Sequence, residues 1–579
     1  MSPRVRLDDL SSPNPSSWEF HEETATGRAE CLADVTCVLV DAERRAAAGD
    51  WVVFVISYEA AGAFDPALRT KPAPPDGTPV VWWSSFAERR RTDRVAPVAS
   101  HVIDRHRAIN VHSYPEAVEM IRDRIALGDV YQVNMTDRFE GHYEGEPIDL
   151  YAGLLGVQSC SHGAYIEMGE RVVASASPEL FFRVEGDVIS CRPMKGTAPR
   201  HPRTDLDRQI GDALTKSVKD QAENVMIVDL LRNDLSRVAE LGTVVVPHLF
   251  QLERYETVWQ LTSTVTAGLA RRVGLVDLLR ALFPCGSITG APKISAMHIV
   301  DELEQQPRGV YCGAIGVLAP PGHEPRIECS VPIRTAVLNP AEHTFVYGAG
   351  GGITWSSEPD AEDDEVRHKA RILTRSHRRF QILETLRLDS NGPVHADLHM
   401  TRMGETAEWF GFDFDRLSLQ SQLASLRADD VSQRLRLLLD SNGVIAIEHH
   451  PLIVDEGPVL VSIDTEITRS DDPFSCHKTT YRRHYDEARR RHPDADDVVL
   501  VNERGHAIEA TIANLAYRIG GDWFVPPLDD GGLAGIGRHV ALGDCRVSER
   551  PIRAADLARC DELAVINDLR GWRRAILID

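Results

Sequence analysis

The sequence predicts an α/β (α+β) protein that is built from two domains. Short apolar runs bounded by polar residues, such as residues 51–58 (WVVFVISY), indicate buried β-strands. Longer stretches with apolar residues at helical spacing, such as residues 205–239, alternate with these runs. A charged stretch over residues 358–379 is followed by a new alternating pattern that begins at Phe380. These observations place a domain boundary near residue 378.

The length of the chain agrees with this division, because 579 residues exceed the usual size of one domain. We expect a flexible end over residues 1–17, which are polar and rich in Ser and Pro. One domain is then expected over residues 18–378 and another over residues 379–579.

The same patterns predict further elements. Residues 172–175, 180–184 and 244–247 favour strands. Residues 205–239 favour one long helix or a helix pair. Residues 287–306 favour another helix, which Ser287 or Thr289 could cap, with Pro292 in its first turn.

Charge and cysteine content exclude several classes of protein. The formal net charge of −23 would repel phosphate backbones, so we expect no nucleic-acid partner. Ten cysteines are scattered without a CxxC pair, which argues against a zinc site or a disulfide framework. The first residues contain no apolar signal segment, and no run of about 18 apolar residues could cross a membrane. A cytoplasmic location without membrane attachment is the expectation.

Three features of the first half suit an anionic ligand. The glycines at 350–352 allow close backbone approach to an anion, although a tight turn explains them equally well. Arg334 lies in an apolar run, where its charge is costly to bury unless it faces an anion, although it could also be an edge-strand residue with its head in water. Glu365 and Lys369 are four residues apart in a helical pattern, and alone they would be read as a surface ion pair.

Seven segments of the first half resemble, in order, the chorismate-utilising enzymes, a family that includes anthranilate, aminodeoxychorismate, isochorismate and salicylate synthases. The segments are residues 128–136, 177–181, 193–197, 222–235, 286–293, 332–334 and 348–353. The resemblance implies a large two-sheet α/β sandwich that binds chorismate, a small dianion. It also assigns substrate contacts, which are Gln132, Thr289, Arg334, Gly350, Gly351 and Lys369.

The resemblance implies a metal site as well. Glu223 and Glu365 match the two glutamates that hold Mg²⁺ against a substrate carboxylate, and two carboxylates with substrate and waters make a sensible Mg²⁺ shell. The sequence Ser-Ser-Glu-Pro-Asp at 356–360 is shifted against the family's usual Ser-Asp-Pro-Glu. The loop before Glu365 therefore departs from the pattern.

Two positions select the reaction within the family. Relatives that add water to chorismate have a lysine base at the position of Gln132, and glutamine cannot be that base because its amide does not titrate. Lys195 stands where anthranilate synthases typically have alanine and where aminodeoxychorismate synthases have lysine, their proposed nucleophile. An attacking lysine must be unprotonated, so its pKa has to be lowered. The resemblance makes Glu179 the proton donor to the departing hydroxyl, although alone it would be an ordinary acidic turn residue.

Ammonia is the remaining reactant. The chain contains no Gly-x-Cys-x-Gly segment of a glutamine amidotransferase, and no region of suitable size is left unassigned. We therefore expect a separate glutamine amidotransferase subunit as a partner.

The second half resembles the class IV aminotransferase fold, whose members include branched-chain and D-amino-acid aminotransferases and aminodeoxychorismate lyase. The segments are residues 383–385, 398–403, 477–480, 485–488, 508–514 and 535–538. The resemblance implies pyridoxal phosphate as the cofactor and a possible homodimer through this domain. Taken alone, Lys478 would be a solvated lysine and Glu509 an exposed strand residue.

The resemblance gives each cofactor contact a residue. Lys478 matches the lysine that anchors the cofactor, and Glu509 matches the partner of its ring nitrogen. Arg402 and the backbone at Ile536 and Gly537 match the phosphate-binding contacts. Gly537 departs from the threonine of many relatives, so one hydroxyl contact is lost.

The two halves together predict 4-aminobenzoate synthesis. The first would aminate chorismate at C4, and the second would remove pyruvate from the product. The alternative is an anthranilate synthase-like first half with a class IV aminotransferase or a non-catalytic module behind it. Lys195 opposes that alternative for the first half, whereas the second half's reaction depends on the pairing of the domains.

Overall fold

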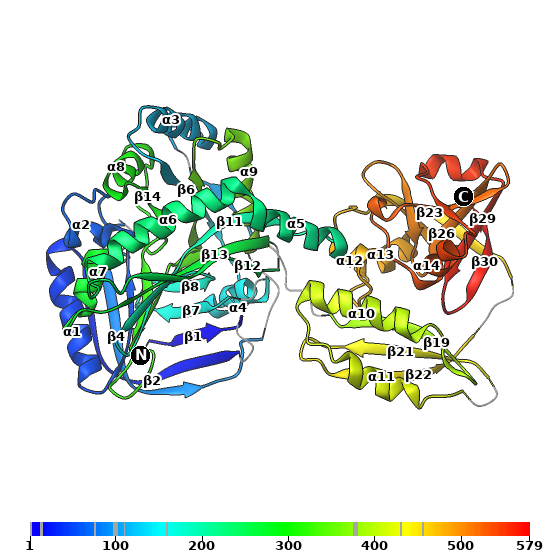
Figure 1. The fold of residues 1–579 in the computed structure, drawn as a ribbon, viewed down its shortest axis with the longest axis horizontal. Helices are drawn as coiled ribbons and strands as arrows, with labels where there is room; N and C mark the ends of the chain where they lie inside the picture. The colour runs from blue at the N-terminus through cyan, green and yellow to red at the C-terminus, as the bar shows by residue number, and fades with distance from the viewer. Residues whose placement is uncertain are drawn as a thin grey trace. The chain divides into compact units, whose positions relative to one another are not determined.

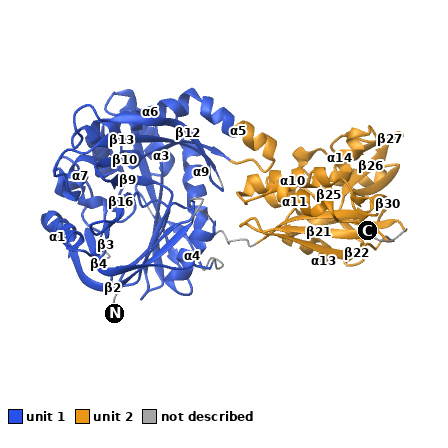
Figure 2. Ribbon diagram, turned by 60° about the horizontal axis from the view of Figure 1, so that its bottom comes forward, with its two compact units in different colours: residues 1–199, 211–377 blue, residues 200–210, 378–579 orange. Residues whose placement is uncertain are grey.

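The computed structural model describes residues 3–11, 15–74, 77–96, 102–108, 110–157, 160–256, 258–374, 380–428, 431–453 and 457–578. The chain divides into two compact units (Figure 2). Unit 1 comprises residues 1–199 and 211–377, and unit 2 comprises residues 200–210 and 378–579. The boundary expected near residue 378 lies outside the described residues. The inclusion of residues 200–210 in unit 2 had no signal in the sequence.

Unit 1 is built on eighteen strands that the described residues join into one hydrogen-bonded network (Figure 1). The strands are β1 (Val5–Asp9), β2 (Ser16–Ala29), β3 (Trp51–Ile56), β4 (Val81–Arg91), β5 (His106–Arg107), β6 (Gln132–His142), β7 (His162–Glu167), β8 (Val172–Ser177), β9 (Leu180–Glu185), β10 (Val188–Arg192), β11 (Met194–Pro199), β12 (Val245–Arg254), β13 (Val258–Gly268), β14 (Gly290–Ala291), β15 (Ala314–Leu318), β16 (Ile327–Ser330), β17 (Thr335–Asn339) and β18 (Thr344–Ile353). Consecutive pairings run β13–β10–β9–β16–β15–β3–β4–β2–β1–β7–β8–β17–β18–β6.

The sheet is covered by helices on two sides. The helices are α1 (Val35–Ala47), α2 (Ala61–Phe64), α3 (Tyr114–Ala126), α4 (Pro147–Val157), α6 (Val218–Ser236), α7 (Leu275–Leu282), α8 (Lys293–Leu303) and α9 (Pro359–Ala370). Helix α5 (Thr204–Lys216) begins in residues assigned to unit 2 and ends in residues assigned to unit 1. One core cluster joins α1, α6 and α7 to the part of the sheet around β3 and β9, and a second joins α3, α4, α8 and α9 to the part around β6 and β8.

A third core cluster lies between these two parts of the sheet. On β3, Val52 and Phe54 belong to the cluster beneath the helices, whereas Trp51 and Val53 belong to the third cluster, which also contains Ile166 of β7. A strand that is buried on both faces reads as a continuous apolar run because successive side chains point to opposite faces. The expected two-sheet sandwich is thereby confirmed, with its two layers formed by one continuous network.

Of the local predictions, the one for residues 205–239 is confirmed, whereas those for the N-terminal residues and for the cap of α8 are wrong. Residues 205–239 form the helix pair α5 and α6, as one of the two expectations had it. Residues 3–11 do not match the flexible end that we expected, because β1 pairs with β2 and β7 and its Val5 is fully buried. Neither Ser287 nor Thr289 caps α8, which begins at Lys293 after Pro292. Both hydroxyls are used elsewhere.

The described residues of unit 2 form two sheets. The first is an antiparallel sheet of β20 (Gly392–Pro393), β19 (Ile382–Asp389), β21 (Gln433–Leu439) and β22 (Ile445–Pro451). The second has the order β25 (Ala507–Ala510), β24 (Asp497–Val501), β23 (Val459–Ile467), β30 (Gly571–Leu577), β29 (Glu562–Asn567), β26 (Asn514–Ile519), β27 (Asp522–Val525) and β28 (Ser548–Glu549). The helices are α10 (Ala396–Phe410), α11 (Arg416–Ala424), α12 (Pro473–Cys476), α13 (Arg483–Arg491) and α14 (Ile536–Gly543). No described helix is long and apolar enough to cross a bilayer.

Candidate active sites

Lys195 lies at an irregularity in β11. The register between β11 and β13 shifts between Met194 and Thr197, and Gly196 between them has a φ of 91°. Bulges of this kind re-aim a side chain next to functional sites, and a positive φ favours glycine. The amide of Asn224 on α6 donates to the Lys195 carbonyl at 3.1 Å, which fixes the bulge from the helix side.

The amine of Lys195 faces the glycine run of β18. A methyl group added at Gly352 would lie 2.4 Å from Lys195 Nζ and 2.8 Å from the amide nitrogen of Gln132. Burial lowers the pKa of Lys195, which the carboxylates of Glu223 and Glu179 oppose. The structure therefore gives this lysine the lowered pKa that a nucleophilic amine requires.

Glu179 lies between β8 and β9 and is 3% exposed. Its carboxyl accepts a hydrogen bond from the Ser287 hydroxyl at 2.6 Å. Burial raises the pKa of Glu179 to about 7, while Ser287 and Lys195 act in the opposite direction. A carboxyl group with this pKa can donate a proton near neutral pH.

Two of the expected substrate contacts have unpaired polar atoms. Gln132 is fully buried, and neither its amide oxygen nor its amide nitrogen has a partner among the described residues. The buried Nη1 of Arg334 likewise has none, and burial lowers the pKa of this guanidinium. Buried polar groups without partners are rare and costly, so these two side chains are suited to meet a polar ligand.

Helix α9 presents Glu365 and Lys369, whose side chains form an ion pair at 2.6 Å. Lys369 also donates to the Gly350 carbonyl at 2.9 Å. Lys369 is the main cause of the lowered pKa of Glu365, and Lys195 lowers it further. Both ends of β18's glycine run thus meet a lysine, Lys369 at Gly350 and Lys195 at Gly352.

The carboxylates expected to hold Mg²⁺ fit that ion in their chemistry. The hydroxyl of Thr354 donates to Glu223 at 3.4 Å, and burial raises the pKa of Glu223. The charges of Lys195 and Lys219 oppose this rise. Among the described residues no three acidic, His or Cys side chains form a ready-made metal cluster. Mg²⁺ commonly takes only one or two protein carboxylates and completes its shell with substrate and water.

Two expected contacts are engaged within the protein. The Thr289 hydroxyl donates to the carbonyls of Cys285 at 3.1 Å and Gly286 at 3.3 Å. The Gly351 amide donates to the Tyr114 hydroxyl at 3.2 Å.

The geometry also brings in two residues that sequence reasoning missed. One is Glu362 of α9, whose carboxylate lies 3.0 Å from where a methyl group on Gly351 would be. The other is Gly352, which the sequence gave only as part of the glycine run and not as the residue that faces Lys195. Burial raises the pKa of Glu362, and Glu365 adds to the rise. The three-residue spacing of Glu362 and Glu365 on one helix face was the available signal.

Substituting Gly352→Ala should displace the Lys195 amine, because the added methyl would be 2.4 Å from Nζ. The end of a lysine side chain can move, so the fold should persist. We expect a decrease of about 10²-fold in turnover of chorismate, since small misplacements of reacting groups have effects of this size. Gly268→Ala is the control, because its methyl would meet only ordinary contacts at 3.4–3.5 Å. Equal rates in both variants would contradict this placement of Lys195.

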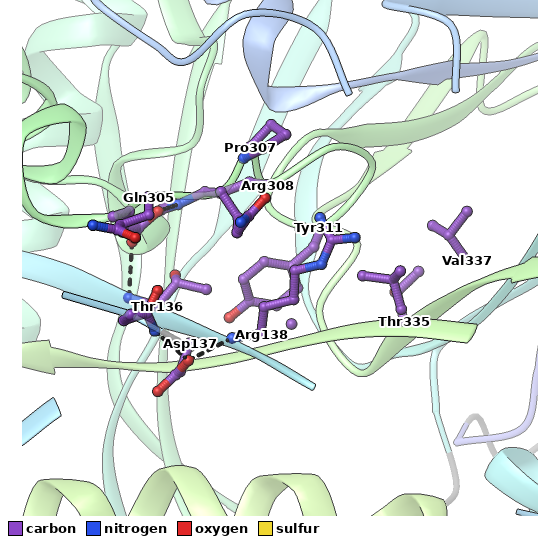
Figure 3. A pocket seen from close by; sticks show the side chains of 14 residues that line it. Thr136, Asp137, Arg138, Gln305, Pro307, Arg308, Tyr311, Thr335 and Val337 are labelled. Atoms are coloured by element: carbon purple, nitrogen blue, oxygen red, sulfur yellow. Dashed lines mark hydrogen bonds and ion pairs between the residues drawn. The ribbon is translucent and has the colours of Figure 1, made fainter. Parts of the chain in front are cut away.

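A cavity of about 40 Å³ lies along β6, β17 and β18, lined by residues that include Thr136, Arg138, Tyr311 and Thr335 (Figure 3). It has room for a few water molecules only. None of Lys195, Gln132 and Glu179 lines it. This cavity is therefore separate from the group of residues around Lys195.

In unit 2, Lys478 follows α12 and is held against β19. The Leu383 amide donates to the Lys478 carbonyl at 2.9 Å, and the Thr480 amide donates to Gln381 at 2.9 Å. Burial and the charge of Arg402 lower the pKa of Lys478 to about 8. Lys478 is also the only lysine in residues 378–579 of the sequence.

Glu509 on β25 is 3% exposed, and two hydrogen bonds orient its carboxylate. Its carboxylate accepts hydrogen bonds from the Tyr485 hydroxyl at 2.7 Å and from the Asn514 amide at 3.1 Å. Burial raises the pKa of Glu509 to about 7. A buried carboxylate with one face held by donors is suited to meet a cationic ring nitrogen.

Arg402 on α10 is bound to Glu384 by two hydrogen bonds of 2.8 and 2.6 Å, and it donates to the Ala534 carbonyl at 2.9 Å. It thereby supports the turn that precedes α14, whose first residues are Ile536 and Gly537. A helix N-terminus with free backbone amides favours a phosphate group. Arg402 therefore contacts the segment that leads into Ile536 and Gly537, the two residues to which the resemblance assigns the phosphate.

Gly537 has a steric reason to replace threonine. A methyl group at this position would lie 2.8 Å from the carbonyl carbon of Asn567 and 3.0 Å from the Asp568 nitrogen. Both are backbone atoms that cannot yield easily. The described residues thus supply a lysine, an acidic partner and a helix N-terminus, and this donor set fits pyridoxal phosphate.

Comparison with known proteins finds matches for both halves of the chain. Residues 381–578 match the family of class IV amino-transferases. Component 1 of aminodeoxychorismate synthase from Salmonella typhimurium is 42% identical over 261 residues, which are 45% of this chain and 56% of that protein. Component 1 of anthranilate synthase from Streptomyces coelicolor is 40% identical over 269 residues, or 46% of this chain and 52% of that protein. The chain spans about half the length of these relatives.

The fold of unit 1 also has solved counterparts. Anthranilate synthase component I from Streptococcus pneumoniae superposes with a TM-score of 0.55 at 24% identity, over 63% of this chain and 93% of that protein. Residues 83–375, just over half of the 579, match the family of chorismate binding enzymes. The chain belongs to the chorismate binding enzyme family.

Proposed function

We propose that the chain converts chorismate to 4-aminobenzoate in two steps, amination at C4 followed by loss of pyruvate. The observation that carries the first step is the pairing of Lys195, whose pKa burial lowers, with Glu179, whose pKa is about 7. Relatives of similar identity bear the names of aminodeoxychorismate synthase and anthranilate synthase. Identity alone therefore does not choose between them, whereas a lysine in this position favours the former.

In the first step Lys195 attacks C2 of chorismate, and the C4 hydroxyl leaves as water with a proton from Glu179. Ammonia then attacks C4, and the bond between C2 and the lysine nitrogen breaks to release Lys195. The proton that Glu179 gave returns from the new C4 ammonium. Gln132, Arg334 and Lys369 would bind the substrate, and Mg²⁺ held by Glu223 and Glu365 would neutralise a substrate carboxylate.

In the second step, pyridoxal phosphate supplies an electron sink for deprotonation at C4. Lys478 would hold the cofactor, and its free amine would remove the C4 proton of the substrate. Glu509 would keep the ring nitrogen protonated, while Arg402 and the N-terminus of α14 would hold the phosphate. Departure of the enolpyruvyl group as pyruvate makes the ring aromatic, which drives the step forward.

Ammonia would come from a partner. The chain has no Gly-x-Cys-x-Gly segment, and a relative carries the name component 1, which supports a separate glutamine amidotransferase subunit. Incubation with chorismate, Mg²⁺, pyridoxal phosphate and an ammonium salt should yield 4-aminobenzoate and pyruvate in equal amounts. Glutamine in place of ammonium should give product only after a glutaminase subunit is added. Anthranilate as the product would overturn the proposal.

A further inference from the structure

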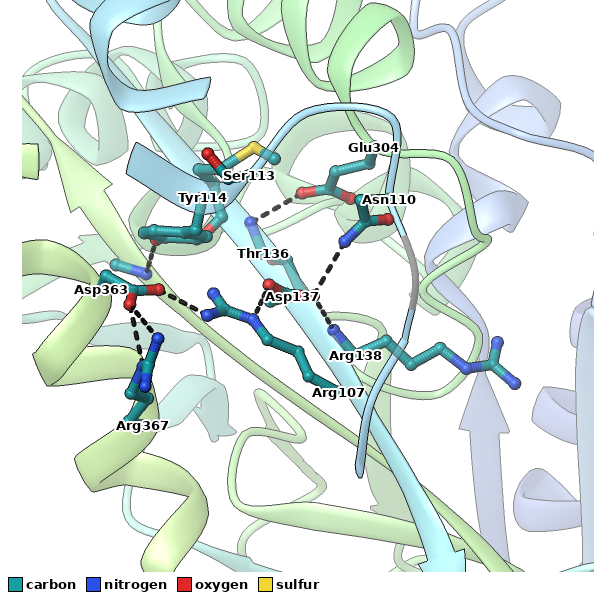
Figure 4. A network of polar contacts seen from close by, with 12 residues as sticks. Arg107, Asn110, Ser113, Tyr114, Thr136, Asp137, Arg138, Glu304, Asp363 and Arg367 are labelled. Atoms are coloured by element: carbon teal, nitrogen blue, oxygen red, sulfur yellow. Dashed lines mark hydrogen bonds and ion pairs between the residues drawn. The ribbon is translucent and has the colours of Figure 1, made fainter. Parts of the chain in front are cut away.

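Arg107 joins three elements of unit 1 through one side chain (Figure 4). It lies on the short strand β5, donates through Nε to Asp137 of β6, and donates through Nη1 to Asp363 of α9. Both carboxylates are buried, with 4% of Asp137 and 7% of Asp363 exposed. The planar guanidinium can serve two carboxylates at once, which a lysine ammonium does poorly.

The groups that face this bridge balance its charge. Asp137 also accepts from the Asn110 amide at 3.0 Å and from the Arg138 backbone at 2.8 Å. Asp363 also accepts from Arg367 at 2.8 Å, four residues along the same helix. Removing one partner from a buried ion pair leaves an uncompensated charge, so this network resists rearrangement.

The ring of Tyr114 lies 5.4 Å from the Arg107 guanidinium. The Tyr114 hydroxyl donates to the Met135 carbonyl at 3.0 Å and accepts from the Gly351 amide at 3.2 Å, so it lies between β6 and β18. Arg107 therefore borders the strand pair that carries the glycine run as well as helix α9.

Helix α9 depends on such contacts because its sequence is mostly polar. Only Val366, Ala370 and Asp363 of its residues are buried. Apolar packing normally fixes the rotation of a surface helix, and α9 has little of it. Glu365 and Lys369 are 47% and 39% exposed, and of the two only Lys369 reaches the sheet, through its hydrogen bond to the Gly350 carbonyl.

We propose that Arg107 is a positioning residue for the first reaction. By holding Asp363 against Asp137, it fixes the rotation of α9 and its position along the helix axis. It thereby sets where Glu365 and Lys369 lie relative to Gly350 and Lys195. The proposal rests on the function proposed above, because that function gives Glu365 and Lys369 their roles. Arg107 itself contacts neither of the two.

The full-length chain offers a matched pair of variants. Arg107→Ala removes the bridge between β6 and α9, whereas Arg367→Ala removes an arginine from the same Asp363 carboxylate but only within α9. Hydrogen exchange measured by mass spectrometry without metal or substrate should be at least about 10-fold faster across residues 359–370 in Arg107→Ala. In Arg367→Ala, exchange across residues 359–370 should match the wild type. Exchange across residues 380–578 should match the wild type in both variants.

Kinetics give a second readout. In Arg107→Ala the Mg²⁺ concentration for half-maximal amination should rise by about 10- to 100-fold, the range seen when groups that orient metal ligands are lost. Millimolar guanidinium should restore part of this loss, because the free ion can re-form the bridge. Arg107→Lys should raise the Mg²⁺ requirement by less than Arg107→Ala, because an ammonium can still serve one of the two carboxylates. It replaces Arg107→Ala in both measurements if that variant does not fold.

Each outcome decides the inference. Equal exchange rates and equal Mg²⁺ requirements in Arg107→Ala and Arg367→Ala would overturn it, as would a loss of activity in Arg107→Ala or Arg107→Lys with no change in exchange at α9. A wild-type chain that does not aminate chorismate would overturn the proposed function. The exchange experiment would then still show whether Arg107 holds α9.

Discussion

Replacing Lys195 with alanine should abolish amination of chorismate at C4, with a decrease of at least about 10³-fold, since removal of a covalent nucleophile costs this much or more in other enzymes. Alanine removes the amine that lies opposite Gly352 while leaving the bulge that Gly196 and Asn224 define. Removing a partly buried amine should not destabilise the fold. The rate is measured with an ammonium salt so that no partner is required.

The pH dependence of the wild type provides an independent check. Lys195 must be unprotonated, so the rate should rise with pH as this lysine loses its proton, at a pH below that of an ordinary lysine. Glu179 must be protonated, so the rate should fall as pH passes about 7, the pKa to which burial raises it. In Glu179→Gln the fall on the alkaline side should disappear and the maximal rate should be much lower.

Lys219→Ala is a suitable control for Lys195→Ala. Lys219 is exposed on α6 and also acts electrostatically on Glu223 and Glu365, so its loss removes a positive charge near the same carboxylates. Near wild-type amination in Lys195→Ala would remove the covalent mechanism. A comparable loss in Lys219→Ala would mean that charge, and not the nucleophile, explains the effect.

Sequence reasoning succeeded where the determining information is local. The apolar run at residues 51–58 contains β3, and helical spacing gave α5 and α6. The four-residue separation of Glu365 and Lys369 gave the observed ion pair. The residue assignments from family resemblance remain predictions, although the structure brings Lys195 and Gln132 to one face of Gly352.

The sequence could not supply features that depend on partners distant in the chain. Which glycine faces Lys195 depends on the bulge in β11 and on its pairing with β13, neither of which has a local pattern. The Ser287 hydroxyl looked like a helix cap, yet Glu179, 108 residues away, accepts its hydrogen bond. The absence of threonine at Gly537 is explained only by the nearby backbone at Asn567.

Replacing Lys478 with alanine should leave amination intact and stop the loss of pyruvate, so that the aminated intermediate, 4-amino-4-deoxychorismate, accumulates. Alanine can neither anchor the cofactor nor remove the C4 proton, and we expect the second rate to fall by at least about 10³-fold. Lys195 and Glu179 belong to unit 1, whereas Lys478 belongs to unit 2, so the first reaction should keep its rate.

Two measurements make this prediction sharp. Lys478 is the only lysine in residues 378–579, so borohydride treatment of the cofactor-loaded chain should leave a cofactor-sized mass on one unit 2 peptide, and Lys478→Ala should abolish it.

Because burial and Arg402 lower the pKa of Lys478 to about 8, its unprotonated amine becomes available from near pH 8 upwards. Formation of the visible absorption band on adding pyridoxal phosphate to the cofactor-free chain should therefore quicken as pH rises towards that value.

Pyruvate released at the wild-type rate by Lys478→Ala would show that the second half is not the lyase. Consumption of an amino donor by the wild type, without 4-aminobenzoate, would favour a transaminase.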